Sequence, residues 1–263
     1  MTISQFIAKH SGLGKRHAKK LLDSGLVFLN HQPITDGNLP LGKFDHLSAN
    51  GEILQARTAR YLLLHKPIGI LSATTDKNHR TVIDLIDEPW ATELHLAGRL
   101  DRATSGLVIL TNDSRFSESL TSPENHVPKT YLVHTDQPIP DTVLKQFRDG
   151  MSFEKENTRS APAEVELLTE ASCRLTIYEG LHHQIKRMFL RFGIRVTQLH
   201  RESIGIYHLE NLQPGEWRNI GLPVIQSGPR LKPDSIVQAI KADRDERDEK
   251  NALTFKTKPD TPK

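Results

Sequence analysis

The sequence predicts an α+β protein in which a small N-terminal domain precedes a larger domain with a mixed, mostly antiparallel sheet. Helical spacing of apolar residues marks the first 25 residues and three later segments, whereas short apolar or alternating runs, typical of strands, recur from residue 61 to residue 199. Strands and helices do not alternate regularly, and no segment repeats with a fixed period. This distribution favours an α+β fold over a βαβ fold.

Residues 1–56 predict a helix–turn–helix–strand unit. A first helix is indicated by the spacing of Ile3, Phe6 and Ile7, and residues 11–14 interrupt it. The apolar face of a second helix carries Ala18, Leu21 and Leu22. Gly25 stands where a left-handed helix C-cap belongs. A strand over residues 26–29 then leads to a turn at residues 30–32, where His31 is among the residues that tolerate a positive φ.

The larger domain is expected over residues 57–225, after a linker at residues 55–60. The expected strands are residues 61–65, 107–111, 131–134, 165–168, 175–178 and 195–199. The expected helices are residues 114–120, 141–149 and 183–192, and the last has an apolar stripe of Ile185, Met188, Phe189 and Phe192 that we expect in the core. Residues 226–263 are expected to form a flexible C-terminal extension, because charged residues of both signs outnumber apolar ones there.

Basic residues gather in two segments that contain no acid, although the net charge is only +3. The first segment contains Lys9, Lys15, Arg16, Lys19 and Lys20. The second contains Lys186, Arg187, Arg191, Arg195 and Arg201. Such segments predict local patches that bind a polyanion, and the alternative is a pair of solvated helix faces.

Several classes of protein are excluded by composition. No apolar run approaches the roughly 20 residues of a membrane helix, and the N-terminus does not resemble a signal peptide. A single cysteine, Cys173, cannot form an internal disulfide, so we expect a cytoplasmic protein. No histidine pair at helical spacing stands beside a carboxylate, and Gly12–Gly14 lacks the context of a nucleotide-binding loop. We therefore expect no metal and no cofactor.

Asp101 is the candidate catalytic residue. It follows the apolar residues Leu94, Leu96 and Leu100, and it precedes a small polar turn at residues 103–106 and the apolar strand beyond. A carboxylate on a turn between buried segments can lie in a cleft. The competing interpretation is a structural Asp whose side chain caps its own turn, because short polar side chains commonly bond nearby backbone groups.

The complete string around Asp101 favours catalysis. Gly98-Arg99-Leu100-Asp101-x-x-Thr104-Ser105-Gly106-Leu107 resembles the catalytic motif of the RsuA/RluB/RluF family of ribosomal RNA pseudouridine synthases. Three further segments resemble motifs of that family, in the same order: Tyr61–Gly69 with its Lys-Pro-x-Gly turn, Lys129–Val133 with its Lys-x-Tyr strand, and Glu179–Phe189. The resemblance extends from Thr2 to about Ile220 and implies the pseudouridine synthase fold.

The resemblance implies a role for each site residue. Asp101 would be the catalytic carboxylate, Tyr131 would stack on the base, and Lys186 would pair with the carboxylate and keep it ionised. Ile185 would pack against the target base, and Arg99 would fill the space that the flipped base vacates. Arg187 would contact phosphate or remain solvated.

The N-terminal segment, about Thr2 to Ala56, is similar to the S4-like RNA-binding module. Three basic residues of its second helix, Lys15, Arg16 and Lys19, would then bind the RNA backbone. The expected partner is ribosomal RNA or a ribosomal subunit assembly intermediate, bound by a monomer without any membrane association.

The reaction that the resemblance implies is the isomerisation of uridine to pseudouridine in ribosomal RNA. The versions of two motifs, residues 183–189 and 199–205, look closest to the enzyme of the small subunit, so 16S rRNA is the favoured substrate. The alternatives are a large-subunit (23S) rRNA pseudouridine synthase, a non-catalytic RNA-binding or ribosome-assembly protein and, less favoured, an N-glycosidase.

Overall fold

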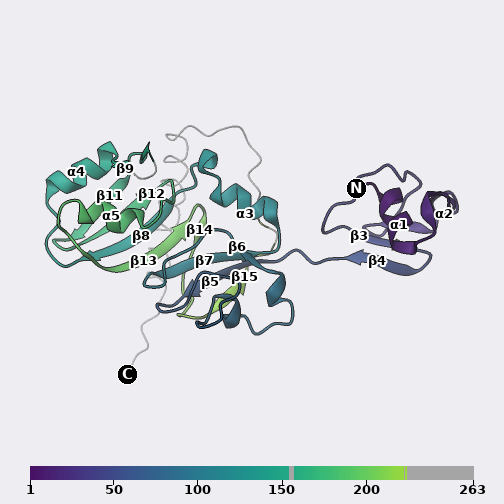
Figure 1. Ribbon diagram of the computed structural model, residues 1–263, viewed down its shortest axis with the longest axis horizontal. Coiled ribbons are helices and arrows are strands. Elements are labelled where there is room, and N and C mark those ends of the chain that lie inside the picture. The colour runs from purple at the N-terminus through teal and green to yellow at the C-terminus, as the bar shows by residue number, and fades with distance from the viewer. Residues whose placement is uncertain (154–156, 222, 224–263) are drawn as a thin grey trace, which may run out of the picture. The chain divides into compact units, whose positions relative to one another are not determined.

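The chain is divided into two units, Met1–Arg60 and Tyr61–Lys263, each with its own internal contacts. The structure is a computed structural model in which residues 1–153, 157–221 and 223 are described (Figure 1). The expected C-terminal extension lies outside the described residues. No helix in the described part of the chain has the length and hydropathy needed to span a membrane.

The N-terminal unit begins with two short helices, α1 (Ile3–Ser11) and α2 (Gly14–Asp23). Helix α1 starts with a capping box, because the Thr2 side chain accepts a bond from the Gln5 N–H and the Gln5 side chain bonds back to Thr2. Helix α2 ends in a Schellman motif, in which the Gly25 N–H donates to Leu22 O and the Leu26 N–H to Leu21 O. The expected C-cap glycine is confirmed, with φ of 66° at Gly25.

A four-stranded antiparallel sheet completes this unit, in the order β2-β1-β3-β4. Its strands are β1 (Val27–Leu29), β2 (Gln32–Pro33), β3 (His46–Ala49) and β4 (Glu52–Ala56). The turn between β1 and β2 has positive φ at both Asn30 and His31, 49° and 67°, as a two-residue hairpin requires. The core between helices and sheet contains Ile3, Ile7, Ala18, Leu22, Val27, Leu47 and Ala49.

The second unit is built on a nine-stranded sheet with a main strand order β11-β12-β8-β13-β7-β5-β15. Its strands are β5 (Tyr61–Lys66), β6 (His95–Leu96), β7 (Ser105–Thr111), β8 (Lys129–Thr135), β11 (Glu164–Thr169), β12 (Ser172–Ile177), β13 (Val196–Ile204), β14 (Tyr207–His208) and β15 (Trp217–Asn219). Among the paired strands, only β13 and β7 run parallel. The predicted mixed, mostly antiparallel sheet is confirmed.

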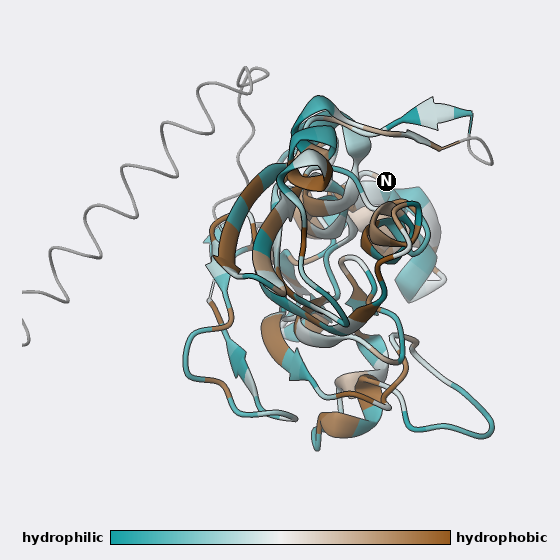
Figure 2. Ribbon diagram, turned by 90° about the vertical axis from the view of Figure 1, so that its left-hand side faces the viewer, coloured by the Kyte–Doolittle hydropathy of each residue, from teal (hydrophilic) through white to brown (hydrophobic). Residues whose placement is uncertain are grey.

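Helices α4 (Asp141–Asp149) and α5 (Gln184–Leu190) pack on the sheet, where α4 contacts β11 and α5 contacts β13. The rings of Phe147 and Phe189 meet edge to face at 4.9 Å and join the two helices. Helix α3 (Ser114–Thr121) contacts β7 instead. Figure 2 shows how apolar segments concentrate in the strands of the large sheet and in the helices that cover it.

Short elements connect this framework. They are the 3-10 turns η1 (Ile83–Leu85), η2 (Ala91–Glu93) and η3 (Pro123–Asn125), together with a separate hairpin of β9 (Ser152–Phe153) and β10 (Thr158–Arg159). The hairpin follows α4 directly, so it extends from the same side of the sheet as that helix.

Two expectations about the last helix are wrong. Helix α5 ends at Leu190, and Phe192 is 39% exposed instead of lying in the core. After the helix, two hydrogen bonds close single turns: the Phe192 N–H donates to Phe189 O and the Gly193 N–H donates to Leu190 O. Gly193 then adopts a left-handed backbone conformation. Phe192 therefore does not continue the buried face of Ile185, Met188 and Phe189.

The expected end of the following strand is also wrong, because strand β13 runs to Ile204, five residues past its expected end at residue 199.

Candidate active site

Asp101 occupies a turn between Leu100 and strand β7, closed by a bond from the Thr104 N–H to the Asp101 backbone carbonyl, 3.0 Å long. Its side chain is turned toward helix α5. Asp101 Oδ2 accepts a hydrogen bond from Lys186 Nζ at 2.9 Å, and Oδ1 lies 3.3 Å from His183 Nε2. The carboxylate therefore contacts an ammonium and an imidazole, whereas the structural alternative required it to cap its own turn.

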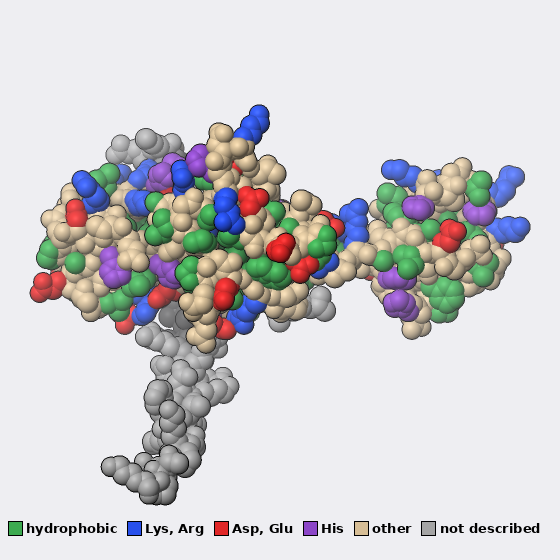
Figure 3. All heavy atoms as spheres, turned by 90° about the horizontal axis from the view of Figure 1, so that it is seen from below, with side chains coloured by type: hydrophobic (Ala, Val, Ile, Leu, Met, Phe, Trp, Pro, Cys, Tyr) green, Lys and Arg blue, Asp and Glu red, His purple; other side chains and the backbone are tan. Residues whose placement is uncertain are grey.

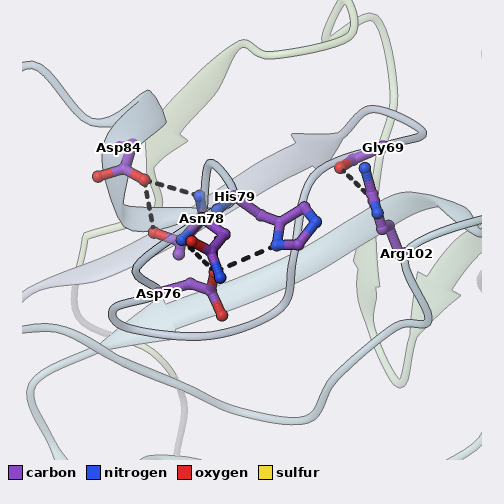
Figure 4. A network of polar contacts seen from close by, with 7 residues as sticks. Gly69, Asp76, Asn78, His79, Asp84 and Arg102 are labelled. Atoms are coloured by element: carbon purple, nitrogen blue, oxygen red, sulfur yellow. Dashed lines mark hydrogen bonds and ion pairs between the residues drawn. The ribbon is translucent and has the colours of Figure 1, made fainter.

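Three backbone contacts hold the chain around Asp101. The Leu100 N–H donates to the buried Ser72 hydroxyl at 3.0 Å. Gly69 and Arg102 bond to each other twice, through the Gly69 N–H to Arg102 O at 2.8 Å and Arg102 Nε to Gly69 O at 3.1 Å (Figure 4). The Lys-Pro-x-Gly turn and the Asp101 turn are thus joined side by side, and each limits the movement of the other.

The loop after Gly69 is itself tied by carboxylates. Asp76 Oδ1 accepts bonds from the N–H groups of Asn78 and His79, both at 2.9 Å, and these bonds lower the pKa of Asp76 (Figure 4). Asp84 Oδ2 accepts bonds from the N–H and the hydroxyl of Thr81. These contacts order the loop that carries Ser72.

Arg201 links the same turn to strand β8 from within the core. Its side chain is 2% exposed, and Nε donates to Leu107 O at 2.8 Å. Nη1 lies 3.4 Å from both Arg99 O and the Tyr131 hydroxyl. Because Arg99 and Leu107 lie on either side of Asp101 in the chain, one guanidinium bonds to both ends of the Asp101 segment and to Tyr131.

Gly106 permits this arrangement. Strands β7 and β13 run parallel here, with Arg201 opposite Gly106, and a Cβ at Gly106 would lie 2.3 Å from Arg201 O. The φ of Gly106 is 114°, which side chains rarely adopt. Both observations require glycine at this position of the motif.

Helix α5 begins at His183, which has a left-handed backbone with φ of 50° and serves as the N-cap residue. Ile185 is 3% exposed and belongs to the core cluster. Lys186 points to Asp101, and the guanidinium of Arg187 donates to His182 O at 3.1 Å and lies 4.7 Å from the centre of the Phe153 ring. The helix thus presents its cations to fixed partners.

Tyr131 lies on β8 and is 7% exposed, with the Arg201 guanidinium 5.9 Å from its ring centre. Lys129, two residues earlier on the same strand, donates to Val127 O at 2.8 Å. Burial, and to a smaller extent the Arg201 charge, lower the pKa of Lys129 to about 8, although Glu179 opposes the shift.

Lys66 at the end of β5 is fully buried. Its ammonium donates to the carbonyl oxygens of Pro67 and Ile70 at 2.9 and 2.8 Å. Burial lowers its pKa to about 8; the Asp101 carboxylate opposes this shift, and Arg201 adds to it. Two cations therefore lie near the Asp101 carboxylate: Lys186, which contacts it, and Lys66, whose pKa it influences.

The structure brings together only part of the expected site. Asp101 and Lys186 are in contact, and Tyr131 joins them through Arg201 and the Asp101 segment. The Arg99 side chain is exposed, and only its carbonyl takes part in the contacts named above. Lys15, Arg16 and Lys19 are exposed on α2 in the other unit.

Three contributors were not expected at this site: His183, Lys66 and Arg201. His183 was expected only as the first residue of the last helix. In the described part of the chain, no group of three or more His, Cys, Asp or Glu residues could hold a metal ion. Arg201 was placed in a basic surface patch, and this is wrong, because its guanidinium is buried and bonded. No signal in the sequence marks Arg201 as buried, because its neighbours His200, Glu202 and Ser203 are polar and the strand was expected to end at residue 199.

Comparison with known proteins gives one family. A family model described as RNA pseudouridylate synthase matches residues 60–191. The crystal structure of a pseudouridylate synthase superposes with a TM-score of 0.60 at 33% sequence identity, covering 90% of this chain and 98% of that one. The fold is therefore that of the RNA pseudouridine synthases, which are isomerases.

Curated relatives identify the family within the pseudouridine synthases. Ribosomal small subunit pseudouridine synthase A of Pseudomonas aeruginosa is 39% identical over 229 residues, or 86% of this chain and 100% of the relative. The protein of the same name from Escherichia coli K12 is 39% identical over 220 residues, or 83% of this chain and 95% of the relative. The chain belongs to the RsuA family of pseudouridine synthases.

Proposed function

We propose that this protein isomerises a uridine of small-subunit (16S) ribosomal RNA to pseudouridine, with Asp101 as the catalytic carboxylate. The assignment to small-subunit RNA is supported by the relatives, which are named ribosomal small subunit pseudouridine synthase A. The observation that carries the proposal is the half-buried Asp101 carboxylate, held 2.9 Å from Lys186 Nζ and 3.3 Å from His183 Nε2. A turn residue with a merely structural role does not need that pair of partners.

The reaction breaks the bond between ribose C1′ and uracil N1, rotates the base, and joins C1′ to C5. The proton of C5 is lost and N1 gains one, so atoms and electrons balance without an oxidant or an external group. Asp101 acts as a nucleophile toward the sugar or the base, or as the base that generates a glycal-like intermediate. Lys186 and His183 aim the carboxylate and stabilise its charge.

Tyr131, Ile185 and Arg99 complete the proposed substrate site. Tyr131 and Ile185 contact the uracil, and the exposed Arg99 side chain fills the space that the flipped nucleotide leaves in its stack. Since Tyr131 is 7% and Ile185 3% exposed, the base meets only the edge of each side chain. Both residues therefore set the shape of the pocket more than they bind by area.

We assign binding of the RNA backbone to an S4-like domain at residues 1–56 and catalysis to residues 57–225. The exposed cations Lys15, Arg16 and Lys19 on α2 contact phosphates, and Arg187 adds a contact beside the site. Figure 3 shows Lys and Arg side chains projecting from the N-terminal unit. The protein acts in the cytoplasm as a monomer on ribosomal RNA or a subunit assembly intermediate, and it needs no cofactor.

The test is Asp101→Asn, which keeps the shape of the side chain and removes its charge. We expect no detectable pseudouridine in 16S rRNA incubated with this variant, while its affinity for the RNA stays within about twofold of wild type. Retained activity would overturn the role of Asp101. A pseudouridine map of 23S rRNA, measured in parallel, tests the large-subunit alternative, and wild-type protein that binds RNA but modifies neither RNA would indicate a pure RNA-binding protein.

A further inference from the structure

A hollow of about 380 Å³ opens between the end of α4, the β9–β10 hairpin and the end of α5, the helix that carries Lys186. Its described lining combines polar, basic and apolar residues: Gln146, Gly150, Met151, Ser152, Arg159, Arg191 and Phe192. Two of them are arginines, and no carboxylate is found among these lining residues. The described lining of the hollow therefore carries positive charge.

Arg159 is fixed at the rim of this hollow. Its Nη2 donates to the backbone carbonyls of Asp149 and Gly150 at 3.0 and 3.3 Å, which are free because helix α4 ends there. Gly150 keeps the hairpin close, since a Cβ at this residue would lie 2.6 Å from Ser160 O. The remaining guanidinium donors, Nε and Nη1, bond to no described residue.

Arg191 is held from the opposite side by an aromatic ring. Its guanidinium lies 5.8 Å from the centre of the Phe153 ring, and that of Arg187, one helical turn earlier, lies 4.7 Å from the same ring. Phe153 is 2% exposed, so the ring is a rigid support. A cation–π contact orients a guanidinium without neutralising its charge, and the Arg191 charge stays available to an anion.

Two oriented guanidinium groups across one hollow match the oxygens of a phosphate, which arginine binds in bidentate fashion. Helix α5 also carries Lys186, the partner of Asp101, and Arg191 follows the end of this helix. At 1.5 Å and about 100° per residue, Arg191 lies about 7.5 Å farther along the helix axis and about 140° around it, so an RNA strand would have to pass around the helix to contact both. An RNA strand that delivers a uridine to Asp101 and takes this path brings its neighbouring phosphates to this region. We propose that Arg159 and Arg191 bind a backbone phosphate of the substrate RNA in this hollow, an inference that rests on the proposed function.

The experiment measures the affinity of the full chain for in vitro transcribed 16S rRNA across about 50–200 mM salt, a range in which phosphate contacts dominate the salt dependence. We expect Arg159→Gln and Arg191→Gln each to weaken binding by about threefold to tenfold. The double variant should lower the slope of log affinity against log salt by roughly 0.7–0.9 for the one phosphate that is lost. The turnover rate at saturating RNA should be unchanged, because neither residue contacts Asp101.

Arg148→Gln is the matched control. Arg148 is an exposed arginine of helix α4 whose Nη2, like that of Arg159, donates to a backbone carbonyl, Val165 O at 3.0 Å, but it is not among the residues that line the hollow. We expect the control to keep the wild-type slope. A double variant with the slope of the control would overturn the proposal. Arg191→Lys keeps the positive charge, so it should keep the salt slope while weakening affinity. If its salt slope fell as far as that of Arg191→Gln, the charge of Arg191 would not be bound to a phosphate, which would count against the proposal.

The two proposals fail in distinguishable ways. If wild-type protein forms no pseudouridine but the double variant loses the expected slope, the proposed function is wrong and the phosphate site stands. If wild type forms pseudouridine and the double variant binds RNA with the wild-type slope, the phosphate site is wrong and the function stands. Melting temperatures within about 3 °C of wild type would show that the variants are folded.

Discussion

Helices α2 and α5 both carry Lys and Arg residues, but the surroundings of these cations differ. In α2, Lys15, Arg16, Lys19 and Lys20 are all exposed, and within the described ranges their side chains form no ion pair or hydrogen bond. In α5, Lys186 contacts Asp101 at 2.9 Å, and Arg187 contacts His182 O and the Phe153 ring. One helix presents charge to solvent, and the other holds it against fixed partners.

The difference follows from what lies beneath each helix. Two residues of α2, Ala18 and Leu22, are buried, so most of its circumference faces water. Four of the seven residues of α5 are buried; Lys186 lies beside the Asp101 turn and Arg187 beside the β9–β10 hairpin. Solvated cations give salt-dependent attraction to a polyanion, whereas fixed cations place and stabilise a particular charge. Three predictions test this distinction, from the largest expected effect to the smallest.

Arg201→Lys should have the largest effect, because it weakens a fixed cation that joins three groups. A lysine keeps the charge but cannot reach Leu107 O, Arg99 O and the Tyr131 hydroxyl together. We expect the turnover rate to fall by about 10- to 100-fold with little change in KM, because a displaced catalytic group costs rate more than binding. Steady-state kinetics on 16S rRNA, well below the melting temperature, provide the measurement.

A purely structural role of Arg201 would give a different result. The variant would then lose stability, by about 1–3 kcal/mol for the lost bonds, while the folded fraction kept the wild-type turnover rate. Unchanged turnover in folded Arg201→Lys protein would therefore contradict a positioning role.

Neutralising α2 should have a smaller effect, limited to binding. In the triple variant Lys15→Gln, Arg16→Gln, Lys19→Gln, we expect affinity for 16S rRNA to fall by about tenfold or more at 150 mM salt and the salt slope to decrease by roughly 0.7–0.9 for each lost contact. The turnover rate at saturating RNA should not change. Filter binding at several salt concentrations measures both quantities.

The control for α2 neutralises a charge of the opposite sign elsewhere in the same unit. Glu52, exposed on β4 of the same unit, offers Glu52→Gln, which should leave affinity unchanged or strengthen it slightly. If the triple variant bound RNA with the wild-type salt slope, the α2 cations would be ordinary solvated residues.

Lys66→Met should have the smallest effect, visible only in the pH dependence of stability. Burial lowers the pKa of Lys66 from 10.5 to about 8. Between these values the unfolded chain binds more protons than the folded chain, so the free energy of unfolding rises with pH through this window; below about pH 8 the cost of burying the charge is present in full. Measured relative to Lys66→Met, the free energy of unfolding of the wild-type protein should increase by about 1–2 kcal/mol from pH 7 to pH 10.

Urea unfolding at several pH values measures this difference. Lys19→Met, at an exposed position of α2, is the comparison and should show the same pH dependence as wild type. If Lys66→Met showed it too, Lys66 would titrate normally despite its burial.

Local patterns were reliable where the local chain decides the structure. The C-cap at Gly25, the tight turn at Asn30 and His31, and helix α4 with its expected bounds all depend on neighbouring residues. The end of α5 was wrong for the opposite reason. Its apolar spacing continues to Phe192, but the chain turns away after Leu190 to enter β13, and sequence spacing does not contain that turn.

By itself, the sequence determined the fold class, most strands and helices, and the turn that carries Asp101, because hydrophobic period and turn residues act over a few positions. Only the tertiary structure decided which cations meet that carboxylate. Lys186 lies 85 residues from Asp101, and Arg201 is 102 residues from the Arg99 carbonyl that it approaches. Arg191 and Arg201 belong to one basic segment and look alike in the sequence, but Arg201 is buried with fixed bonds, whereas Arg191 is exposed.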